Sequence, residues 1–503
     1  MTRVLVVLAL AASAATPSWT EPRVLSDTGR ALGPEFAVNA SGAAIAVWDS
    51  ETGPDCAQTP ASLTCIHTVE AAGRDHSGAA WDSPVAIARP GIGDRPTVAM
   101  NDAGRAAIIW VHDIGRDRVV QATYRVGPTA AFPNPSDLSA DVLEVRSHHV
   151  ALDAAGNTVA VWAERHVDTF EVAAEVRSAA SGTWGAPIVL SKGAVTAGPA
   201  LSVTPAGAAF VAWVEGGVVQ VARGDLSGGA WESPVAVSSG AGSEVALAVN
   251  AAGDAVVVSG GQAASRPVGG AWSAGALVDA SLVAAGPDVA LAAEGTAVAV
   301  WVGGDGYLRA AVRRNEGPWS APAVVAPGSA SAPQVAIDPG GNAIALWRDD
   351  ANLMAALRPA VAGAWQLAEK LAGGETSSPR VALDAAGNGV AVWNSRSGDL
   401  VPVFTADFAA AWQPTLDNTR RPAIGGRARV GRTVVCNRGQ WAGTVPIRFA
   451  YSWLRNGRLV QSAHELRYRI RRADAGARLA CRVTATNPAR TMVVTSPPVR
   501  VSR

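Results

Sequence analysis

The chain has 503 residues and a balanced charge, with 42 lysine and arginine residues against 42 aspartate and glutamate residues. Beyond its N-terminus, the sequence contains no apolar run of membrane-spanning length that is free of glycine and charge. No nucleic-acid recognition motif is evident either, so we expect neither a membrane span in the mature chain nor a nucleic-acid partner.

The N-terminus has the three parts of a secretory signal peptide. Arg3 supplies the positive start, residues 4–12 form an apolar core that is too short to span a membrane, and residues 12–14 are a small-residue cleavage site. We therefore predict that residues 1–14 are a signal peptide. The mature protein is expected to be secreted, extracellular or on the cell surface.

A β-hairpin unit recurs along most of the chain, and residues 381–393, VALDAAGNGVAVW, are one copy. Its first residues alternate in the manner of a strand. Asp384 is then placed to accept backbone N–H groups two residues on, and Gly387 occupies a position that needs a positive φ. The apolar run that follows predicts a fully buried return strand, which ends at Trp393.

This hairpin has eight copies at a spacing of about 46 residues, which is the period of a repeat architecture. The copies end at Trp48, Trp110, Trp162, Trp213, Ser259, Trp301, Trp347 and Trp393. A second aromatic signature lies between the hairpins, at Trp19, Trp81, Phe132, Trp184, Trp231, Trp272, Trp319, Trp365 and Trp412. Because the tryptophans keep one register in every repeat, we interpret them as packing elements and not as platforms for sugars.

Four strand-like segments per repeat predict the blades of a β-propeller, each a four-stranded antiparallel sheet. We expect an all-β chain in which residues 16–417 form the propeller. Eight hairpins favour eight blades, and seven is the alternative if the repeat around Ser259 is irregular. The second aromatic signature occurs nine times, which is one more than the number of hairpins. The strand after Trp19 is therefore expected to close the ring by joining the last blade.

The turn before the fourth strand of one repeat contains Asp225, Gly229 and Trp231. This pattern resembles a degenerate form of the Asp-box of sialidase-type propellers, without its Ser, Thr and full spacing. The resemblance implies the propeller fold and, as an alternative function, a sialidase-like glycoside hydrolase or lyase. Sialidases use a tyrosine nucleophile, whereas Tyr124 and Tyr307 fall on expected third strands, away from the channel. The expected first strands, which line the channel, show no cluster of arginine and carboxylate residues.

Loop length varies mainly after the second strand of each repeat, and variable loops on a rigid scaffold commonly carry binding residues. The loops of the first three repeats, residues 49–72, 111–118 and 163–170, are therefore our candidates for a binding face. Their candidate residues are Asp49, Glu51, His67, His112, Asp113, Arg116, Glu164, Arg165, His166 and Asp168. The alternative is that these residues are ordinary solvated loop charges.

The composition changes at about residue 418, and the remaining stretch resembles the Ig-like domains of bacterial surface proteins. The matching residues are Gly431, Cys436, Gly439, Trp441, Tyr451, Trp453, Arg455, Gly457, Asp474, Gly476, Cys481 and Asn487. The resemblance implies a small β-sandwich over residues 418–503, with Cys436 and Cys481 bridging its two sheets and Trp453 packed on them. Leu479 departs from antibody-type domains, which place a tyrosine two residues before the second cysteine.

Four cysteines, an even number in an exported chain, favour two local disulfides. We expect one disulfide between Cys56 and Cys65 and a second between Cys436 and Cys481. No metal site is predicted, because no histidine pair has a ligand spacing.

The two parts carry opposite charge. Residues 418–503 contain 18 arginines against two acids, whereas residues 1–417 contain 24 basic residues against 40 acids. No Ser-His-Asp, zinc or phosphate-loop motif is present, so neither catalytic residues nor a cofactor are predicted. We expect a non-catalytic binding or interaction protein that uses a propeller loop face and an Arg-rich Ig-like module. Its expected partner is an envelope polysaccharide or a surface protein.

Overall fold

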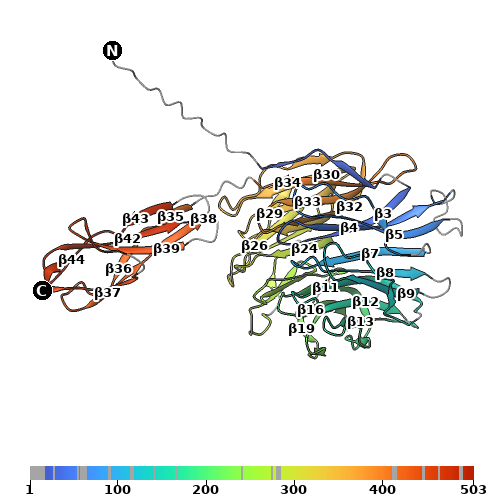
Figure 1. The fold of residues 1–503 in the computed structure, drawn as a ribbon, viewed down its shortest axis with the longest axis horizontal. Coiled ribbons are helices and arrows are strands. Elements are labelled where there is room, and N and C mark those ends of the chain that lie inside the picture. Colours follow the sequence, from blue (N-terminus) through green and yellow to red (C-terminus); the bar gives the residue numbers. More distant parts are fainter. Residues whose placement is uncertain are drawn as a thin grey trace, which may run out of the picture. The chain divides into compact units, whose positions relative to one another are not determined.

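The structure is a computed structural model (Figure 1). It describes residues 17–26, 29–53, 56, 65–88, 92–113, 118–140, 142–165, 167–239, 242–273, 276–278, 285–410, 416–443, 448–462, 465–486 and 491–503. The expected signal peptide lies outside these ranges, as do Arg116 and His166. The chain divides into a larger unit, Pro17–Ala360 with Ala364–Ala410, and a smaller unit that contains Ala411–Arg503. In the described ranges, no helix has the length and apolar character that a membrane crossing requires.

The larger unit forms eight antiparallel sheets in the described ranges, which we number sheet 1 to sheet 8 in chain order. Sheet 1 joins β3 (Arg30–Val38), β4 (Ala44–Thr52), β5 (Ile66–Arg74) and β6 (Val85–Ala86). Sheet 2 joins β7 (Ile92–Met100), β8 (Ala106–Asp113), β9 (Arg118–Arg125) and β10 (Ser136–Asp137). Sheet 3 joins β11 (Glu144–Leu152), β12 (Thr158–Arg165), β13 (Phe170–Arg177) and β14 (Ile188–Val189). Sheet 4 joins β15 (Val195–Val203), β16 (Ala208–Glu215), β17 (Val218–Asp225), β18 (Ala230–Trp231) and β19 (Val235–Ser239).

The remaining four sheets repeat the same strand order. Sheet 5 joins β20 (Ala246–Val249), β21 (Ala255–Ser259), β22 (Gln262–Arg266) and β23 (Ala276–Leu277). Sheet 6 joins β24 (Ala285–Leu291), β25 (Ala297–Val302), β26 (Leu308–Arg313) and β27 (Ala323–Ala326). Sheet 7 joins β28 (Ala330–Ile337), β29 (Ala343–Asp349), β30 (Asn352–Arg358) and β31 (Glu369–Ala372). Sheet 8 joins β32 (Glu375–Leu383), β33 (Gly389–Arg396), β34 (Val403–Ala409), β1 (Ser18–Trp19) and β2 (Arg23–Ser26).

The hairpin turn has the geometry that the sequence predicts. Oδ1 of Asp384 accepts the backbone N–H groups of Ala386 at 2.9 Å and Asn388 at 2.8 Å. Gly387 has a φ of 83°, and the equivalent glycine of every other repeat also has a positive φ. Because only glycine adopts this conformation at low cost, the repeated glycine fixes the turn between the first two strands.

The core of the larger unit is divided among the interfaces between neighbouring sheets. Trp347 of sheet 7, for example, packs against Val298 and Val300 of sheet 6. The seven hairpin tryptophans are buried, and none is more than 2% exposed: Trp48, Trp110, Trp162, Trp213, Trp301, Trp347 and Trp393. This confirms that the hairpin signature is a packing element.

The sheets follow one another in a closed succession. The first strands of consecutive sheets contact each other, and β32 of sheet 8 contacts β3 of sheet 1. Sheet 8 is completed from the other end of the unit, because β1 and β2 pair with β34. This confirms that the segment after Trp19 joins the last repeat. The repeat that ends at Ser259 forms a four-stranded sheet like its neighbours. In the described ranges, the larger unit is therefore an all-β arrangement of six four-stranded and two five-stranded antiparallel sheets that is consistent with a β-propeller.

The smaller unit contains three further sheets. One pairs β35 (Leu416–Arg420) with β38 (Gln440–Gly443), and the second joins β36 (Ala423–Gly425), β37 (Thr433–Asn437) and β41 (Arg467–Arg469). The third joins β40 (Arg458–Ser462), β39 (Arg448–Arg455), β42 (Arg478–Thr486), β43 (Thr491–Thr495) and β44 (Val499–Arg500), and a 3-10 turn spans Arg472–Asp474.

Both disulfides have the pairing that the sequence predicts, Cys56 with Cys65 and Cys436 with Cys481. The second joins β37 to β42, which belong to different sheets of the smaller unit. Trp453 is buried beside it and stacks on Tyr468 with ring centroids 5.3 Å apart.

Candidate functional site

The candidate residues of the first repeat lie on strands. Asp49 and Glu51 occupy the end of β4, and His67 lies on β5 directly opposite Glu51. This corrects the expectation that residues 49–72 form one loop, because β4 continues four residues beyond Trp48 and pairs with β5 over its whole length. The three residues are at most 9% exposed, so they are not solvated loop charges.

Asp49, Glu51 and His67, which we call the sheet 1 cluster, face one another. Nδ1 of His67 lies 2.8 Å from Oδ2 of Asp49, and Nε of Arg30 donates to Oε2 of Glu51 at 2.8 Å. Each of the three residues presents an oxygen or nitrogen atom, and these atoms all lie within 4.8 Å of one another. Nε2 of His67 is also 3.8 Å from Sγ of Cys65, so the disulfide borders the cluster.

The candidate Glu164 serves the core. Nε1 of the buried Trp162 donates to its carboxylate at 2.5 Å. The indole of Trp48 donates in the same way to Glu70 at 2.9 Å. A buried indole N–H needs an acceptor, so Glu164 is explained by packing without a ligand.

Two of the remaining candidates, Arg165 and Asp113, form ion pairs within their own sheets. Nη2 of Arg165 lies 2.9 Å from Oε2 of Glu144, and Nε of Arg118 lies 3.4 Å from Oδ2 of Asp113. The other two candidates in the described ranges are His112, which is half-buried on β8, and Asp168, which is exposed before β13. The candidates of the second and third repeats therefore do not extend the sheet 1 cluster into one larger site.

The first strands bring together charged groups that the sequence analysis did not find. Nη2 of Arg380 on β32 lies 2.5 Å from Oε1 of Glu35 on β3, which joins sheets 8 and 1. Asp288 on β24 accepts the backbone N–H of Val335 at 2.8 Å, which joins sheets 6 and 7. Burial raises the pKa of Asp288 to about 6, and Arg380 interacts electrostatically with it. The expectation that the first strands hold no cluster of arginine and carboxylate residues is therefore wrong.

His149 on β11 is another titratable residue on a first strand, and it interacts electrostatically with Glu35. Burial lowers its pKa, and the charge of Glu35 opposes this decrease. His149 is nevertheless solvent-accessible. Glu35, His149, Asp288 and Arg380 each lie thirteen residues before the end of their hairpin, a spacing that could have revealed them. The residues at this spacing in the other repeats are Thr97, Ala200, Ala246 and Gln334.

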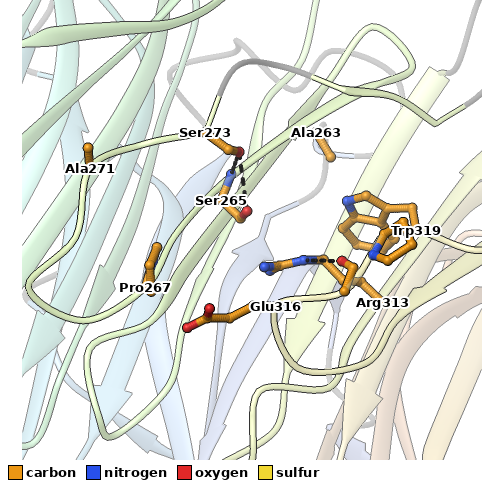
Figure 2. A pocket seen from close by; sticks show the side chains of 10 residues that line it. Ala263, Ser265, Pro267, Ala271, Ser273, Arg313, Glu316 and Trp319 are labelled. Carbon is orange, nitrogen blue, oxygen red and sulfur yellow. Dashed lines mark hydrogen bonds between the residues drawn. The ribbon is translucent and has the colours of Figure 1, made fainter.

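Several hollows lie between neighbouring sheets in the described ranges, and two of them occupy equivalent positions. The hollow between sheets 5 and 6, which we call groove 5/6, has a volume of about 510 Å³. Figure 2 shows it from close by. Sheet 5 contributes Ala263, Ser265, Pro267, Ala271 and Ser273, and sheet 6 contributes Arg313, Glu316, Gly317, Pro318 and Trp319. The hydroxyl groups of Ser265 and Ser273 are 3.3 Å apart, and Nε of Arg313 donates to the carbonyl of Gly317 at 3.0 Å.

The second hollow, groove 3/4, has a volume of about 390 Å³ and occupies the same place between sheets 3 and 4. Trp231 lies at its edge as Trp319 does in groove 5/6, and both follow a turn that contains glycine. Ala174 and Val176 of β13 correspond in strand register to Ala263 and Ser265 of β22. The other lining residues are Ser178, Ser181, Thr183, Trp184, Gly185, Ala186, Ile188, Leu226, Ser227, Gly228 and Gly229.

The tryptophans of the second aromatic signature, which we call the outer tryptophans, are more exposed than the hairpin tryptophans. Those in the described ranges are half-buried: Trp19, Trp81, Trp184, Trp231, Trp272, Trp319 and Trp365. An indole that is partly exposed beside hydroxyl and charged groups presents an apolar face together with hydrogen-bonding groups. Each of these tryptophans also packs against an apolar core cluster, as the interpretation as packing elements predicts, and its exposed part remains open to a ligand. The neighbouring residues in the sequence distinguish the two classes of tryptophan. Trp319 lies in the polar stretch EGPWSAP, whereas Trp347 ends the apolar run AIALW.

No protein-family model and no curated protein matches the chain. Among solved structures, the chain is similar to the BP39L lectin from Burkholderia pseudomallei, with 17% identity, a TM-score of 0.48, and coverage of 70% of this chain and 100% of the lectin. It is also similar to a fungal alcohol oxidase of the AA5 family in complex with copper, with 10% identity, a TM-score of 0.43, and coverage of 97% of this chain and 100% of the oxidase. A protein of unknown function from Dyadobacter fermentans shares 9% identity, with a TM-score of 0.42 and coverage of 78% and 98% of the two chains. None of these similarities is close enough to assign an activity to the chain.

Proposed function

We propose that this chain is an extracytoplasmic, non-catalytic protein that binds carbohydrate in grooves between neighbouring blades. In this proposal, sheets 1 to 8 are the blades of an eight-bladed propeller, and the closed succession of first strands supports that count. The smaller unit is an Ig-like module, supported by the disulfide between two of its sheets and by Trp453 beside it.

The observation that carries the proposal is the recurrence of one groove at equivalent positions of two sheet pairs. In both grooves a half-buried tryptophan lies at the border of one sheet, and the third strand of the preceding sheet forms the opposite wall. A sugar ring has apolar C–H faces and equatorial hydroxyl groups, so it matches an indole face that is flanked by serine hydroxyls. A hollow of a few hundred cubic ångströms is also of the size that small ligands occupy.

The two grooves differ in charge, which suggests different ligands for them. Groove 3/4 is lined by neutral groups, whereas groove 5/6 contains Arg313 and Glu316. A smaller hollow of about 140 Å³ shares both of these residues and adds Asp254, Arg266 and Glu294. Groove 5/6 therefore suits a sugar with charged substituents.

The two disulfides support an oxidising compartment outside the cytoplasm, where an envelope polysaccharide or a surface protein would be the partner. The excess of arginine in residues 418–503 supports a second contact with anionic polymer.

The test is a glycan screen with the purified chain, followed by titration of the best ligand. Trp319→Ala and Trp231→Ala each remove one platform and should lower the affinity of their own groove by about fivefold, because stacking contributes about 1 kcal/mol. Trp319→Phe should restore part of the affinity. Leu367→Ala is the matched control, since Leu367 is 96% exposed and lines neither groove. Unchanged binding in both tryptophan variants would rule out the grooves.

A sialidase-like hydrolase is the second candidate, and the charged first strands favour it. Glu35 pairs with Arg380, whereas the pKa of Asp288 is raised to about 6. Carboxyl groups in different environments are what a general acid and its partner require. Hydrolysis of a chromogenic glycoside that is lost in both Glu35→Gln and Asp288→Asn would support this function, and the absence of any hydrolysis would remove it.

A further inference from the structure

The sheet 1 cluster is absent from the equivalent positions of other repeats. In strand register, Asp49, Glu51 and His67 of sheet 1 correspond to Val111, Asp113 and Arg118 of sheet 2. The same positions of sheet 3 hold Ala163, Arg165 and Phe170. Sheets 2 and 3 form the same hairpins without the cluster, so the fold of a repeat does not require it.

The two carboxylates of the cluster lie close together away from water. Asp49 and Glu51 are each 3% exposed, and their oxygens lie within 4.8 Å of each other. Two like charges at this distance in a buried site repel strongly unless a cation lies between or beside them. Arg30 contacts Glu51 from one side, and the imidazole of His67 contacts Asp49 from the other. The centre of the cluster is therefore a position where a further positive charge is favourable.

We propose that Asp49, Glu51 and His67 bind one divalent transition-metal ion, for which zinc is the best match. Two carboxylate oxygens and one imidazole nitrogen are donors that zinc accepts, whereas calcium and magnesium prefer oxygen ligands alone. The donor atoms already lie within 4.8 Å of one another, so small side-chain rotations bring them to one ion. Three protein ligands leave the fourth position of a tetrahedral ion for a water molecule or a ligand group.

The local structure holds the three donors in place. Asp49 and Glu51 are two residues apart on β4, so their side chains share one face of the strand. His67 is the direct cross-strand neighbour of Glu51. The Cys56–Cys65 disulfide closes the connection between β4 and β5 and ends two residues before His67. The sequence placed all three residues among the candidates for a binding face but predicted no metal site, because the ligands come from two strands that are separated by a long insertion.

The experiment uses the purified full chain without an affinity tag, stripped of metal and titrated with zinc by calorimetry. We expect one zinc ion per chain at the cluster. Asp49→Asn, Glu51→Gln and His67→Gln should each weaken binding by at least about tenfold, since each removes one of three ligands. Asp113→Asn is the matched control, because Asp113 occupies the register position of Glu51 in sheet 2 and should bind zinc as the parent does.

Two further measurements guard against variants that do not fold. Zinc should raise the thermal midpoint of the parent chain, and a chelator should reverse the increase. Cobalt bound in place of zinc should give the visible absorption of a four-coordinate ion with nitrogen and oxygen ligands. No stoichiometric binding, or equal binding in Glu51→Gln and His67→Gln, would overturn the proposal. This site is independent of the carbohydrate grooves, so either proposal can fail alone.

Discussion

The hairpin tryptophans and the outer tryptophans of the larger unit recur with the same period, yet their surroundings differ. Trp347 on β29 is 1% exposed, whereas Trp365 of the same sheet is half-buried, although both contact the same apolar cluster. Trp347 lies on an inner strand of its sheet, whereas Trp365 lies in the connection between β30 and the edge strand β31. The difference teaches that a fixed register identifies the repeat but does not tell whether a side chain is core or surface.

Some of the hairpin tryptophans pair their indole N–H groups with acidic side chains. Trp162 and Trp213 donate their indole N–H groups to Glu164 and Glu215 in the interior. Trp319 instead borders a groove and lies in an isolated bridge opposite Arg313. The pairing of a hairpin indole with an acid is not general, because Nε1 of Trp110 and Nε1 of Trp393 are buried without a hydrogen-bond partner among the described residues. At a groove, an indole N–H can serve a ligand.

The largest expected effect is at the inner position. Trp347→Ala should lower the free energy of unfolding of the larger unit by about 3–5 kcal/mol, because it leaves a cavity between sheets 6 and 7. Denaturant unfolding followed by circular dichroism measures this cost. A loss below about 1 kcal/mol would contradict the assignment of Trp347 to the core.

Glu175 on β13 is a buried carboxyl group, and it tests how burial within a sheet changes the ionisation of a side chain. Six other sheets have alanine at this register position, for example Ala222 and Ala264, and Oε2 of Glu175 makes no hydrogen bond with the described residues. Burial raises the pKa of Glu175 from 4.5 to about 7. The native state therefore favours the protonated acid, and its stability falls as the pH rises from about 4 through 7.

Glu175→Gln removes this titration. The variant should match the parent near pH 4 and should be more stable by about 3 kcal/mol above pH 8, because each unit of pKa shift corresponds to about 1.4 kcal/mol. Unfolding free energies measured across this pH range give the result. A constant difference between variant and parent would show that Glu175 remains ionised in the folded state.

The smallest effect is expected at the outer position of the same sheet. Trp365→Ala should cost about 1–2 kcal/mol, since only part of the indole leaves an apolar environment. Measured beside Trp347→Ala, it holds residue type, sheet and apolar cluster constant. Equal costs for the two substitutions would remove the distinction between inner and outer tryptophans.

The sequence predicts what depends on neighbours along the chain. The hairpin turn at Asp384 and Gly387 and the four-strand repeat follow from local pattern, and both are present in the structure. The sheet 1 cluster depends on the pairing of Glu51 with His67 across a long insertion, which no local pattern specifies. The contact between Glu35 and Arg380 needs the closure of the whole unit, so it becomes visible only in three dimensions.

The pairing of Ser18 with Ala409 sets the order in which the larger unit can assemble. As the chain is made or exported from its N-terminal end, β1 and β2 emerge first, while their partner β34 follows nearly four hundred residues later. Until then the early segment has no partner, and β34 itself is an open edge that can pair with another chain. Sheet 8 is therefore the last sheet of the larger unit to be completed. Deletion of residues 17–26 should leave β34 as an unpaired edge, and the protein should then associate through β34.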